Sequence, residues 1–313
     1  MPPNAAGRDF RPWMNLLLPI SRAELPGWGR VLRAAGVMVP YWDESWSGAA
    51  ARTCRGKLHG YEMTLDLSDW SERLTFFLGR YYELAVQETL LGILRPGDRF
   101  VDVGANIGMI SLVGAAAVGR EGSVESVEPN PVPRAALEAA LAANDIEHVT
   151  VLALGLGDAP SRLTLSITSD HSGTGTLTEV DADEVSQAFE IDVVRGDDVL
   201  LPDPRPVRMI KIDVEGFEHP ALVGLRGVLE RDGPYLITEF TPETMDEPQA
   251  EFAALTELLA PLGYRAWGLT TQRVGLRHRT HVVSLAQDTP PAGHPELLWC
   301  SEAALAETGL PRL

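Results

Sequence analysis

The side chains in this sequence that could bind or react stand where hydrophobic runs end. The run 99–103 contains Asp102 and leads directly into the turn Gly104-Ala105-Asn106-Ile107-Gly108. Glycine allows a sharp bend and lets a ligand approach the backbone without a Cβ in the way. A helix after such a turn offers free N–H groups and a positive dipole end, which can hold a carboxylate. Asp102 would repel a pyrophosphate but can accept a hydrogen bond from an ammonium. The turn therefore predicts a ligand with an amino-acid end.

Other interpretations of this turn stay open. NAD enzymes, flavoenzymes and ordinary tight turns also use glycine-rich segments, although G-A-N-I-G lacks the third glycine of the dinucleotide pattern. Asp102 is alternatively a polar strand end that caps the following helix.

Two further acids follow the next predicted strands. Glu128 closes the run 123–127, where Rossmann-type sites place a carboxylate that accepts both ribose hydroxyls, and Pro129 then turns the chain away. Gly157-Asp158 follows the third strand, where the carboxylate can accept from an adenine amino group. Each has an ordinary alternative, since Glu128 can be an exposed strand-end acid and Gly-Asp is a common turn dipeptide.

The segment Lys211-Ile212-Asp213-Val214-Glu215 concentrates charge at the end of another apolar run. Alternation along a strand points Lys211, Asp213 and Glu215 to one side. Asp213 and Glu215 are candidate general bases, because neighbouring acids raise each other's pKa. Lys211 opposes that effect and either stabilises a developing anion or forms a structural salt bridge with Asp213.

Two histidines and one more acid complete the candidates. His171 lies in a polar loop of serine, threonine and glycine that could contact a substrate or simply be a solvated connection, and His219 is a further candidate base. Glu239 ends the next predicted strand, and together with Asp213 it could contribute to a site for a hard cation. No diagnostic ligand spacing supports a metal, so none is predicted. Cys54 and Cys300 are expected to be free thiols in a reducing cytoplasm.

The elements that position these residues alternate between strand and helix. Strands are expected at 99–103, 123–127, 149–154, 208–214 and 235–240, with helices at 107–118, 133–144 and 219–231 between them. This order predicts a doubly wound, Rossmann-like, mostly parallel sheet. A helix is expected at 248–262. Strands at 264–269 and 281–286 are expected to complete the sheet as a C-terminal hairpin.

Several motifs carry a resemblance to a known family. FVDVGANIG at 100–108, VEPNP at 127–131, the Gly-Asp at 157–158, VVRGDDVL at 193–200 and MIKIDVEGFEHPALVGL at 209–225 together resemble the FkbM methyltransferases over about residues 80–240. The chain departs from the family pattern at Phe217 and at His219-Pro220, where small, acidic or aliphatic residues are more usual.

The resemblance implies a seven-stranded methyltransferase sheet, S-adenosylmethionine as cofactor, and O-methylation of a hydroxyl on a sugar, a polyketide or another small secondary metabolite. Carried over by position, the cofactor-binding residues would be those of the first two motifs, the Gly-Asp pair and the strand-end acid: Asp102, Gly104, Ala105, Asn106, Gly108, Glu128, Pro129, Asn130, Gly157, Asp158 and Asp213. The catalytic candidates are Asp213, Glu215, Lys211 and His171.

Parts of the sequence are also compatible with functions other than O-methylation. An NAD(P)-dependent oxidoreductase would use the same strand, glycine turn and Glu128, but the third glycine and a Tyr-x-x-x-Lys pair are missing. N- or C-methylation on the same scaffold stays open, because the cofactor site is indifferent to the acceptor. A relative that binds without catalysis is disfavoured by the retained Asp102, Glu128 and Asp213.

Composition limits the partners. The chain has 313 residues, of which 45% are hydrophobic, and its 44 acidic and 26 basic residues leave a net charge of -18. Such a field repels nucleic acid and anionic membranes, so a small hydroxylated substrate is expected. Residues 16–20 are too short an apolar stretch for a signal or membrane segment. The expected location is cytoplasmic.

The expected organisation has three parts. Residues 1–75 would form an N-terminal extension, rich in proline, glycine and tryptophan, that serves as a lid or in oligomerisation, so a homo-oligomer is a possible assembly. Residues 76–290 would be the S-adenosylmethionine-binding methyltransferase domain, and 291–313 a C-terminal tail.

Overall fold

The structure is a computed structural model that describes residues 10–38, 46–167, 175–176, 185–242, 245, 247–291 and 296–313. The chain separates into two compact units, of which the first holds Met1–Leu84 with Arg273–Arg279 and the second holds Ala85–Gln272 with Thr280–Leu313. The expected role of the N-terminal extension as a lid or oligomerisation segment stays a prediction.

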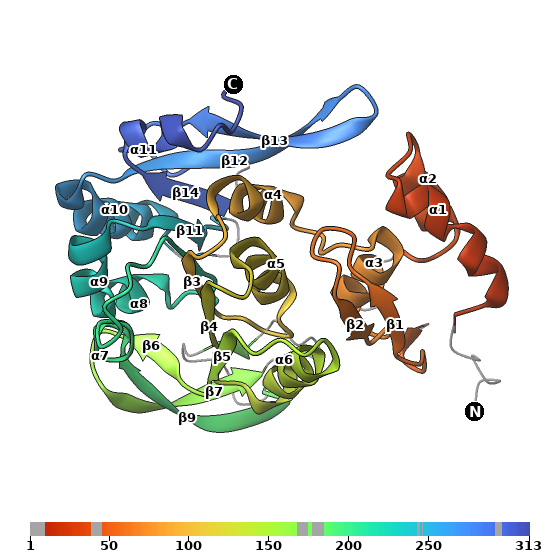
Figure 1. Cartoon of the computed structure of the whole chain (residues 1–313), viewed down its shortest axis with the longest axis horizontal. Coiled ribbons are helices and arrows are strands. Elements are labelled where there is room, and N and C mark those ends of the chain that lie inside the picture. Colours follow the sequence, from red (N-terminus) through yellow and green to blue (C-terminus); the bar gives the residue numbers. More distant parts are fainter. Residues whose placement is uncertain are drawn as a thin grey trace. The chain divides into compact units, whose positions relative to one another are not determined.

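The first unit is a small assembly of short helices and one hairpin (Figure 1). Its elements are η1 (Pro12–Leu16), α1 (Leu18–Arg22), α2 (Trp28–Ala34), β1 (Arg52–Arg55), β2 (Glu62–Leu65) and α3 (Trp70–Leu78). Asp69 begins α3 by accepting hydrogen bonds from the N–H groups of Ser71 and Glu72. Trp46 is fully buried, whereas Trp13 is 45% exposed, so only part of the tryptophan-rich sequence serves the core.

The second unit is built on an eight-stranded sheet with the order β13-β12-β14-β11-β10-β3-β4-β5. Strands β5, β4, β3, β10 and β11 run parallel, and β14 is antiparallel to both β11 and β12. The strands are β3 (Arg99–Val103), β4 (Ser123–Val127), β5 (Val149–Leu152), β10 (Met209–Ile212), β11 (Tyr235–Glu239), β12 (Arg265–Val274), β13 (Arg277–Ser284) and β14 (Glu296–Cys300).

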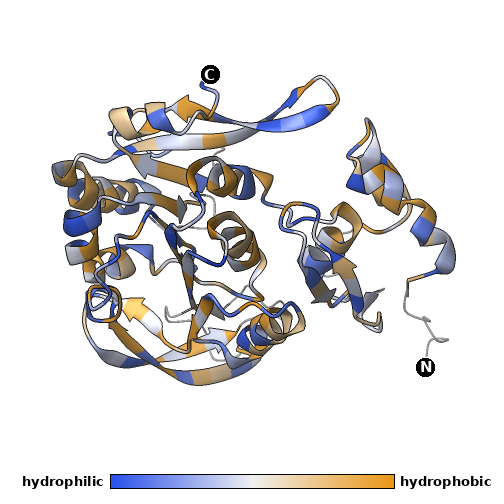
Figure 2. Cartoon of the chain, viewed as in Figure 1, coloured by the Kyte–Doolittle hydropathy of each residue, from blue (hydrophilic) through white to orange (hydrophobic). Residues whose placement is uncertain are grey.

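Helices cover both faces of this sheet (Figure 1). One face carries α4 (Leu84–Ile93), α5 (Met109–Val118) and α6 (Pro131–Ala143), and the other carries α8 (Glu218–Gly224), α9 (Arg226–Asp232) and α10 (Pro248–Leu259) with the short η4 (Ala260–Leu262); α11 (Glu302–Glu307) follows β14. Hydrophobic residues concentrate on the strands and on the helix faces toward them (Figure 2). Burial on both faces explains why strands such as β10 and β11 are mostly apolar.

A smaller sheet with the order β6-β9-β7-β8 adjoins α8. It consists of β6 (Gly155–Gly157), β7 (Ser161–Ile167), β8 (Gly175–Thr176) and β9 (Gln187–Arg195), and β9 leads into α7 (Gly196–Leu200). Leu165, Ile167, Ile191 and Val193 form its own small buried cluster.

The α/β fold class expected from the sequence is confirmed, with three differences. The large sheet has eight strands, not seven. The segment 219–231 forms two helices, α8 and α9, which are separated at the buried Leu225. Residues 296–300, expected in a tail, form β14 between β11 and β12, whereas the two preceding strands, β12 and β13, are neighbours as expected of a hairpin.

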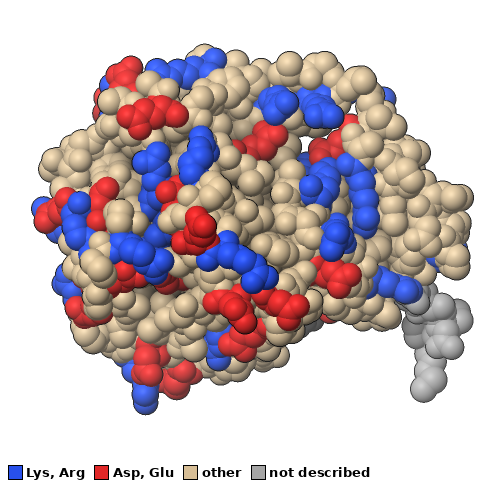
Figure 3. Space-filling view, viewed as in Figure 1, with Lys and Arg blue, Asp and Glu red and all other residues tan. Residues whose placement is uncertain are grey.

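Among the described residues, no helix is both long and apolar enough to cross a bilayer. On the face drawn in Figure 3, side chains of both charge signs are interspersed.

Candidate active site

The glycine turn after β3 is held against the backbone that follows β10. Gly104 has φ +76°, and a Cβ at this position would lie 1.8 Å from the carbonyl oxygen of Asp213. The N–H groups of Gly104 and Ala105 both donate to the carbonyl oxygen of Val127 at 3.0 Å. Gly108 has φ +88°, and a Cβ there would lie 2.4 Å from Leu137. The glycines therefore allow the turn to pack between two strand ends, which an L side chain would prevent.

Asp102 is fully buried beneath this turn. Its Oδ2 accepts a hydrogen bond of 2.6 Å from the Ser111 hydroxyl, and that hydroxyl lies 2.7 Å from the Ser126 hydroxyl. Burial raises the pKa of Asp102, and the nearby Lys211 ammonium and the Ser111 bond partly offset this. The Oδ1 atom has no hydrogen-bond partner among the described residues. One oxygen thus ties β3 to α5 through the Ser111 hydroxyl, although Asp102 is not the cap of α5, whose N-cap is Gly108 without a side-chain capping bond. The other oxygen is an acceptor left for an ammonium or a water.

Glu128 holds two backbone segments together at the end of β4. Its Oε2 accepts from the N–H of Asn106 and its Oε1 from the N–H of Asn130, both at 2.7 Å. Burial raises its pKa to about 7, against the effect of these two hydrogen bonds. Each oxygen keeps a second lone pair, so Glu128 can still accept from a ligand diol. The acid is buried, which contradicts the exposed strand-end alternative.

Asn130 and Pro129 lie beside Glu128. Asn130 is the N-cap of α6, and its side chain accepts from the N–H of Val132. Pro129 is half-buried, and its carbonyl oxygen accepts from the Arg134 guanidinium at 2.9 Å. Both residues were expected to bind the cofactor; the contacts described here are structural.

Replacing Asn130 by Ala is expected to lower the free energy of unfolding by about 1 kcal/mol, because it removes a side-chain N-cap. Asn130→Asp keeps an acceptor at the same position and should restore most of the loss. Chemical denaturation of the ligand-free chain measures both variants. Equal stability of Asn130→Ala and the parent would contradict the capping role.

Lys211 and Asp213 form the centre of the site. The Lys211 ammonium lies 2.8 Å from Asp213 Oδ2 and 3.4 Å from the carbonyl oxygen of Gly104. The lysine side chain is 6% exposed and the aspartate 26%. Burial would raise the pKa of Asp213, but the Lys211 ammonium and hydrogen bonds from Glu239 and Lys211 outweigh it and lower the pKa. Asp213 is therefore ionised at neutral pH.

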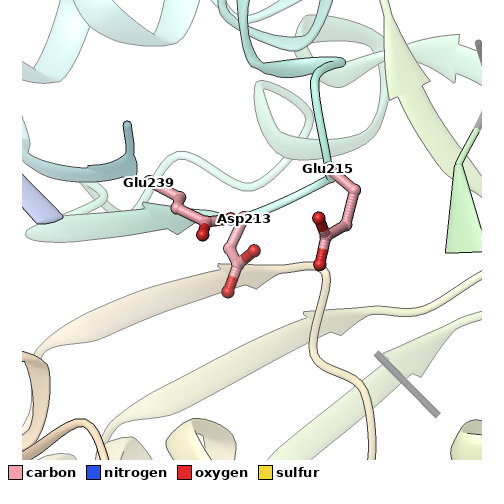
Figure 4. Close-up of side chains that lie close together, drawn as sticks. All are labelled: Asp213, Glu215 and Glu239. Atoms are coloured by element: carbon pink, nitrogen blue, oxygen red, sulfur yellow. The ribbon is translucent and has the colours of Figure 1, made fainter. Parts of the chain in front are cut away.

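Two further carboxyl groups gather around Asp213 (Figure 4). One oxygen of each of Asp213, Glu215 and Glu239 lies within 4.8 Å of the others. Burial and the Asp213 charge raise the pKa of Glu239, so this group is protonated and donates to Asp213. Its Oε1 accepts from the Thr241 hydroxyl at 2.9 Å. Three such oxygens can hold a hard cation, and the Lys211 ammonium lies against the same carboxylate of Asp213.

Glu215 is the exposed member of this trio. It lies beyond the end of β10 and has φ +51°, so strand alternation does not place it. Its carboxyl group nevertheless points in the same direction as that of Asp213 (Figure 4). Desolvation by the surrounding protein, with the charges of Asp213 and Glu218, raises its pKa to about 7. A carboxylate with this pKa is suited to proton transfer near neutrality.

Two acids that the sequence did not single out as site residues also belong here. Glu296 begins β14 directly opposite Glu239 in the antiparallel register, and burial with the Asp213 charge raises its pKa to about 7. Glu218 is buried and accepts from the N–H groups of Val214 and Gly216, which holds the loop after β10. The apolar run 297–300 after Glu296 is the signal that could have revealed a strand.

Two of the predicted residues, Gly157 and Asp158, belong to the smaller sheet or follow directly from it. The Asp158 side chain is exposed after β6, in the smaller sheet. Gly157 is brought close to the loop after β10, since a Cβ there would lie 3.3 Å from Phe217. This contact gives Phe217, which departs from the family pattern, a packing role. His171 lies outside the described residues.

A cavity of about 520 Å³ opens beside the acid trio. It is enclosed by the start of α8, the end of β11 and the first turns of α10, and Glu239 is part of its wall. His219, the other candidate histidine, also lines it.

Comparison with known proteins identifies the family of the chain. The sequence model of the Methyltransferase FkbM domain matches residues 102–266, which is more than half of the chain. The 31-O-demethyl-FK506 methyltransferase FkbM of Streptomyces tacrolimicus is 33% identical over 42% of this chain and 61% of its own length. The chain thus spans less than two thirds of that relative.

Two solved structures are similar at lower identity. Methyltransferase FkbM from Methylobacillus flagellatus KT is 22% identical, with 74% of this chain and 54% of that chain covered and a TM-score of 0.41. A SAM-dependent O-methyltransferase from Thermotoga maritima is 16% identical, with 70% and 64% covered and a TM-score of 0.38. On the match to the family's sequence model, the resemblance seen in the motifs is confirmed, and the chain belongs to the FkbM family of methyltransferases.

Proposed function

We propose that this methyltransferase uses S-adenosylmethionine to methylate a hydroxyl group of a small secondary metabolite or sugar. The observation that carries the proposal is the meeting of the glycine turn after β3 with Lys211, Asp213 and Glu215 at the end of β10. The name of the Streptomyces tacrolimicus relative, an O-demethyl-FK506 methyltransferase, supports oxygen as the methylated atom.

The residues at the ends of β3 and β4 fit this cofactor. The buried, unpartnered Oδ1 of Asp102 is an acceptor of the kind that an ammonium or its bridging water needs. Glu128 has lone pairs left for the ribose hydroxyls, and the N–H groups at the start of α5 suit a carboxylate. The cofactor supplies a methyl group activated by a positively charged sulfur. The acidic surroundings after β10 attract that positive charge.

Proton removal from the acceptor falls to Glu215 in this proposal. Methyl transfer to oxygen requires an in-line approach and the loss of the hydroxyl proton. Glu215 is exposed and has a pKa of about 7, whereas Asp213 has a lowered pKa and is engaged by Lys211 and Glu239. Asp213 then acts as a positioning residue: its charge keeps Glu215 partly protonated, and its pairing holds Lys211 against the glycine turn.

Calorimetric titration with S-adenosylhomocysteine and, separately, with NAD tests the cofactor. Binding of S-adenosylhomocysteine with no binding of NAD is the expected result. The opposite pattern would contradict the proposal. The cofactor site by itself does not distinguish transfer to oxygen from transfer to nitrogen or carbon. A mass-spectrometric search for products heavier by one CH₂ group, with fragmentation that locates the methyl, separates these reactions.

A further inference from the structure

The cavity beside the acid trio has the size and lining of a small-molecule site. Its volume of about 520 Å³ lies in the range of ligand pockets, which are mostly apolar with a few placed polar groups. Phe240, Met245 and Leu255 supply apolar wall. Glu239 lies both in this wall and within 4.8 Å of Asp213 and Glu215 by its carboxyl oxygens, so the cavity borders the acid trio through Glu239.

Four of the lining residues are glutamates, and they divide into two pairs. Glu218 and Glu239 are inner acids whose hydrogen bonds go to the loop after β10 and to Asp213. Glu247 and Glu251 are exposed acids on the α10 side. Glu247 stands at the N-cap position of α10, yet its side chain makes no capping hydrogen bond. Helix capping therefore does not explain why Glu247 lies at the cavity.

Positive charge is scarce in the same wall. Among the described residues that line the cavity, His219 is the one basic side chain, and no lysine or arginine is present. The chain around it carries a net charge of -18. An anionic group would be repelled from such a pocket, whereas a cation would gain from both outer carboxylates.

We propose that this cavity binds the methyl acceptor, and that the acceptor carries a protonated amine on an apolar framework. The amine is held by Glu247 and Glu251, and the apolar framework lies against Phe240, Met245 and Leu255. This inference rests on the proposed function, because it assumes that the molecule in the cavity is the one methylated near Glu215.

Three probes that differ only in their terminal group test the charge preference: 4-phenylbutan-1-amine, 4-phenylbutan-1-ol and 4-phenylbutanoate. Binding to the full chain saturated with S-adenosylhomocysteine is measured by protein-observed NMR titration. The amine is expected to bind about tenfold more tightly than the alcohol, which is the scale of two exposed carboxylate contacts. The carboxylate is expected not to bind.

The double variant Glu247→Gln/Glu251→Gln should bind the amine and the alcohol equally, with the affinity for the alcohol unchanged. Glu257→Gln is the matched control, since Glu257 is an exposed acid of the same helix that does not line the cavity. Equal binding of amine and alcohol by the parent chain, binding of none of the probes, or an unchanged preference in the double variant overturns the inference.

Binding of S-adenosylhomocysteine, measured on the same samples, keeps the two proposals apart. If it binds and the amine preference is absent, only the cavity assignment fails. If it does not bind, the proposed function fails, and the probe titrations without it still report whether the cavity selects a cation.

Discussion

Replacing Glu215 by Gln is expected to lower turnover by about 10²–10⁴-fold, the usual contribution of a positioned general base. The amide cannot take the hydroxyl proton, while its size and exposure match those of the acid. Because Glu215 is an exposed side chain, the free energy of unfolding should change by less than about 0.5 kcal/mol. Turnover is measured as formation of S-adenosylhomocysteine with an acceptor found by the mass-shift search, and stability by denaturation.

Asp213→Asn provides the contrast. It removes the carboxylate charge that lies 2.8 Å from the Lys211 ammonium, a side chain that is 6% exposed, and breaking a buried ion pair costs up to about 3–5 kcal/mol. Asp213→Asn should therefore lose both turnover and stability. Glu215→Gln should lose turnover and keep its stability. Glu239→Gln should retain most of the stability, since Glu239 is protonated and an amide can donate to Asp213 in its place. Full turnover by Glu215→Gln would remove Glu215 from the mechanism and leave Asp213 as the base.

Replacing Gly104 by Ala is expected to destabilise the chain strongly and to abolish binding of S-adenosylhomocysteine. The new Cβ would lie 1.8 Å from the carbonyl oxygen of Asp213, in a backbone with φ +76°. No rotamer change relieves a clash between two backbones, so β3 and the segment after β10 must separate. That movement would also draw the glycine turn away from Lys211, whose ammonium is 3.4 Å from the Gly104 carbonyl oxygen.

Gly97→Ala is the matched control for this substitution. Gly97 also has a positive φ, +91°, but no atom lies within 4 Å of the position a Cβ would take. It should cost only the left-handed backbone energy of about 1–2 kcal/mol. Gly104→Ala is expected to cost at least about 2 kcal/mol more, because overpacking is added to the backbone energy. Denaturation curves of the two variants measure the difference, and equal destabilisation would show that contact with Asp213 is unimportant.

Local patterns in the sequence were enough to predict much of the large sheet. The apolar residues and the turn residues identify β3 and β10, because a strand buried on both faces is mostly hydrophobic. The same reasoning placed Asp102, Glu128 and Asp213 at one edge of the sheet, since parallel strands end on the same side. The motifs around these acids were specific enough to indicate the family.

The predicted convergence of three charged side chains near the end of β10 is correct, but its physical cause is not the strand alternation from which it was predicted. Lys211, Asp213 and Glu215 do meet, but β10 ends at Ile212. Their convergence depends on the positive φ of Glu215 and on the hydrogen bonds that Glu218 accepts from the loop. A rule about strand alternation cannot anticipate a turn whose shape is set by a buried acid.

The sequence by itself thus determined the parallel α/β core, the family and the acids at the ends of its strands, because these depend on neighbours within a few residues. Only the tertiary structure decided that β14 inserts beside β11 and brings Glu296 opposite Glu239, because strand order is set by packing between distant segments. It also decided which acids are ionised. Burial and the distance to Lys211 separate Asp213, with its lowered pKa, from Glu215 and Glu239, whose pKa values are raised.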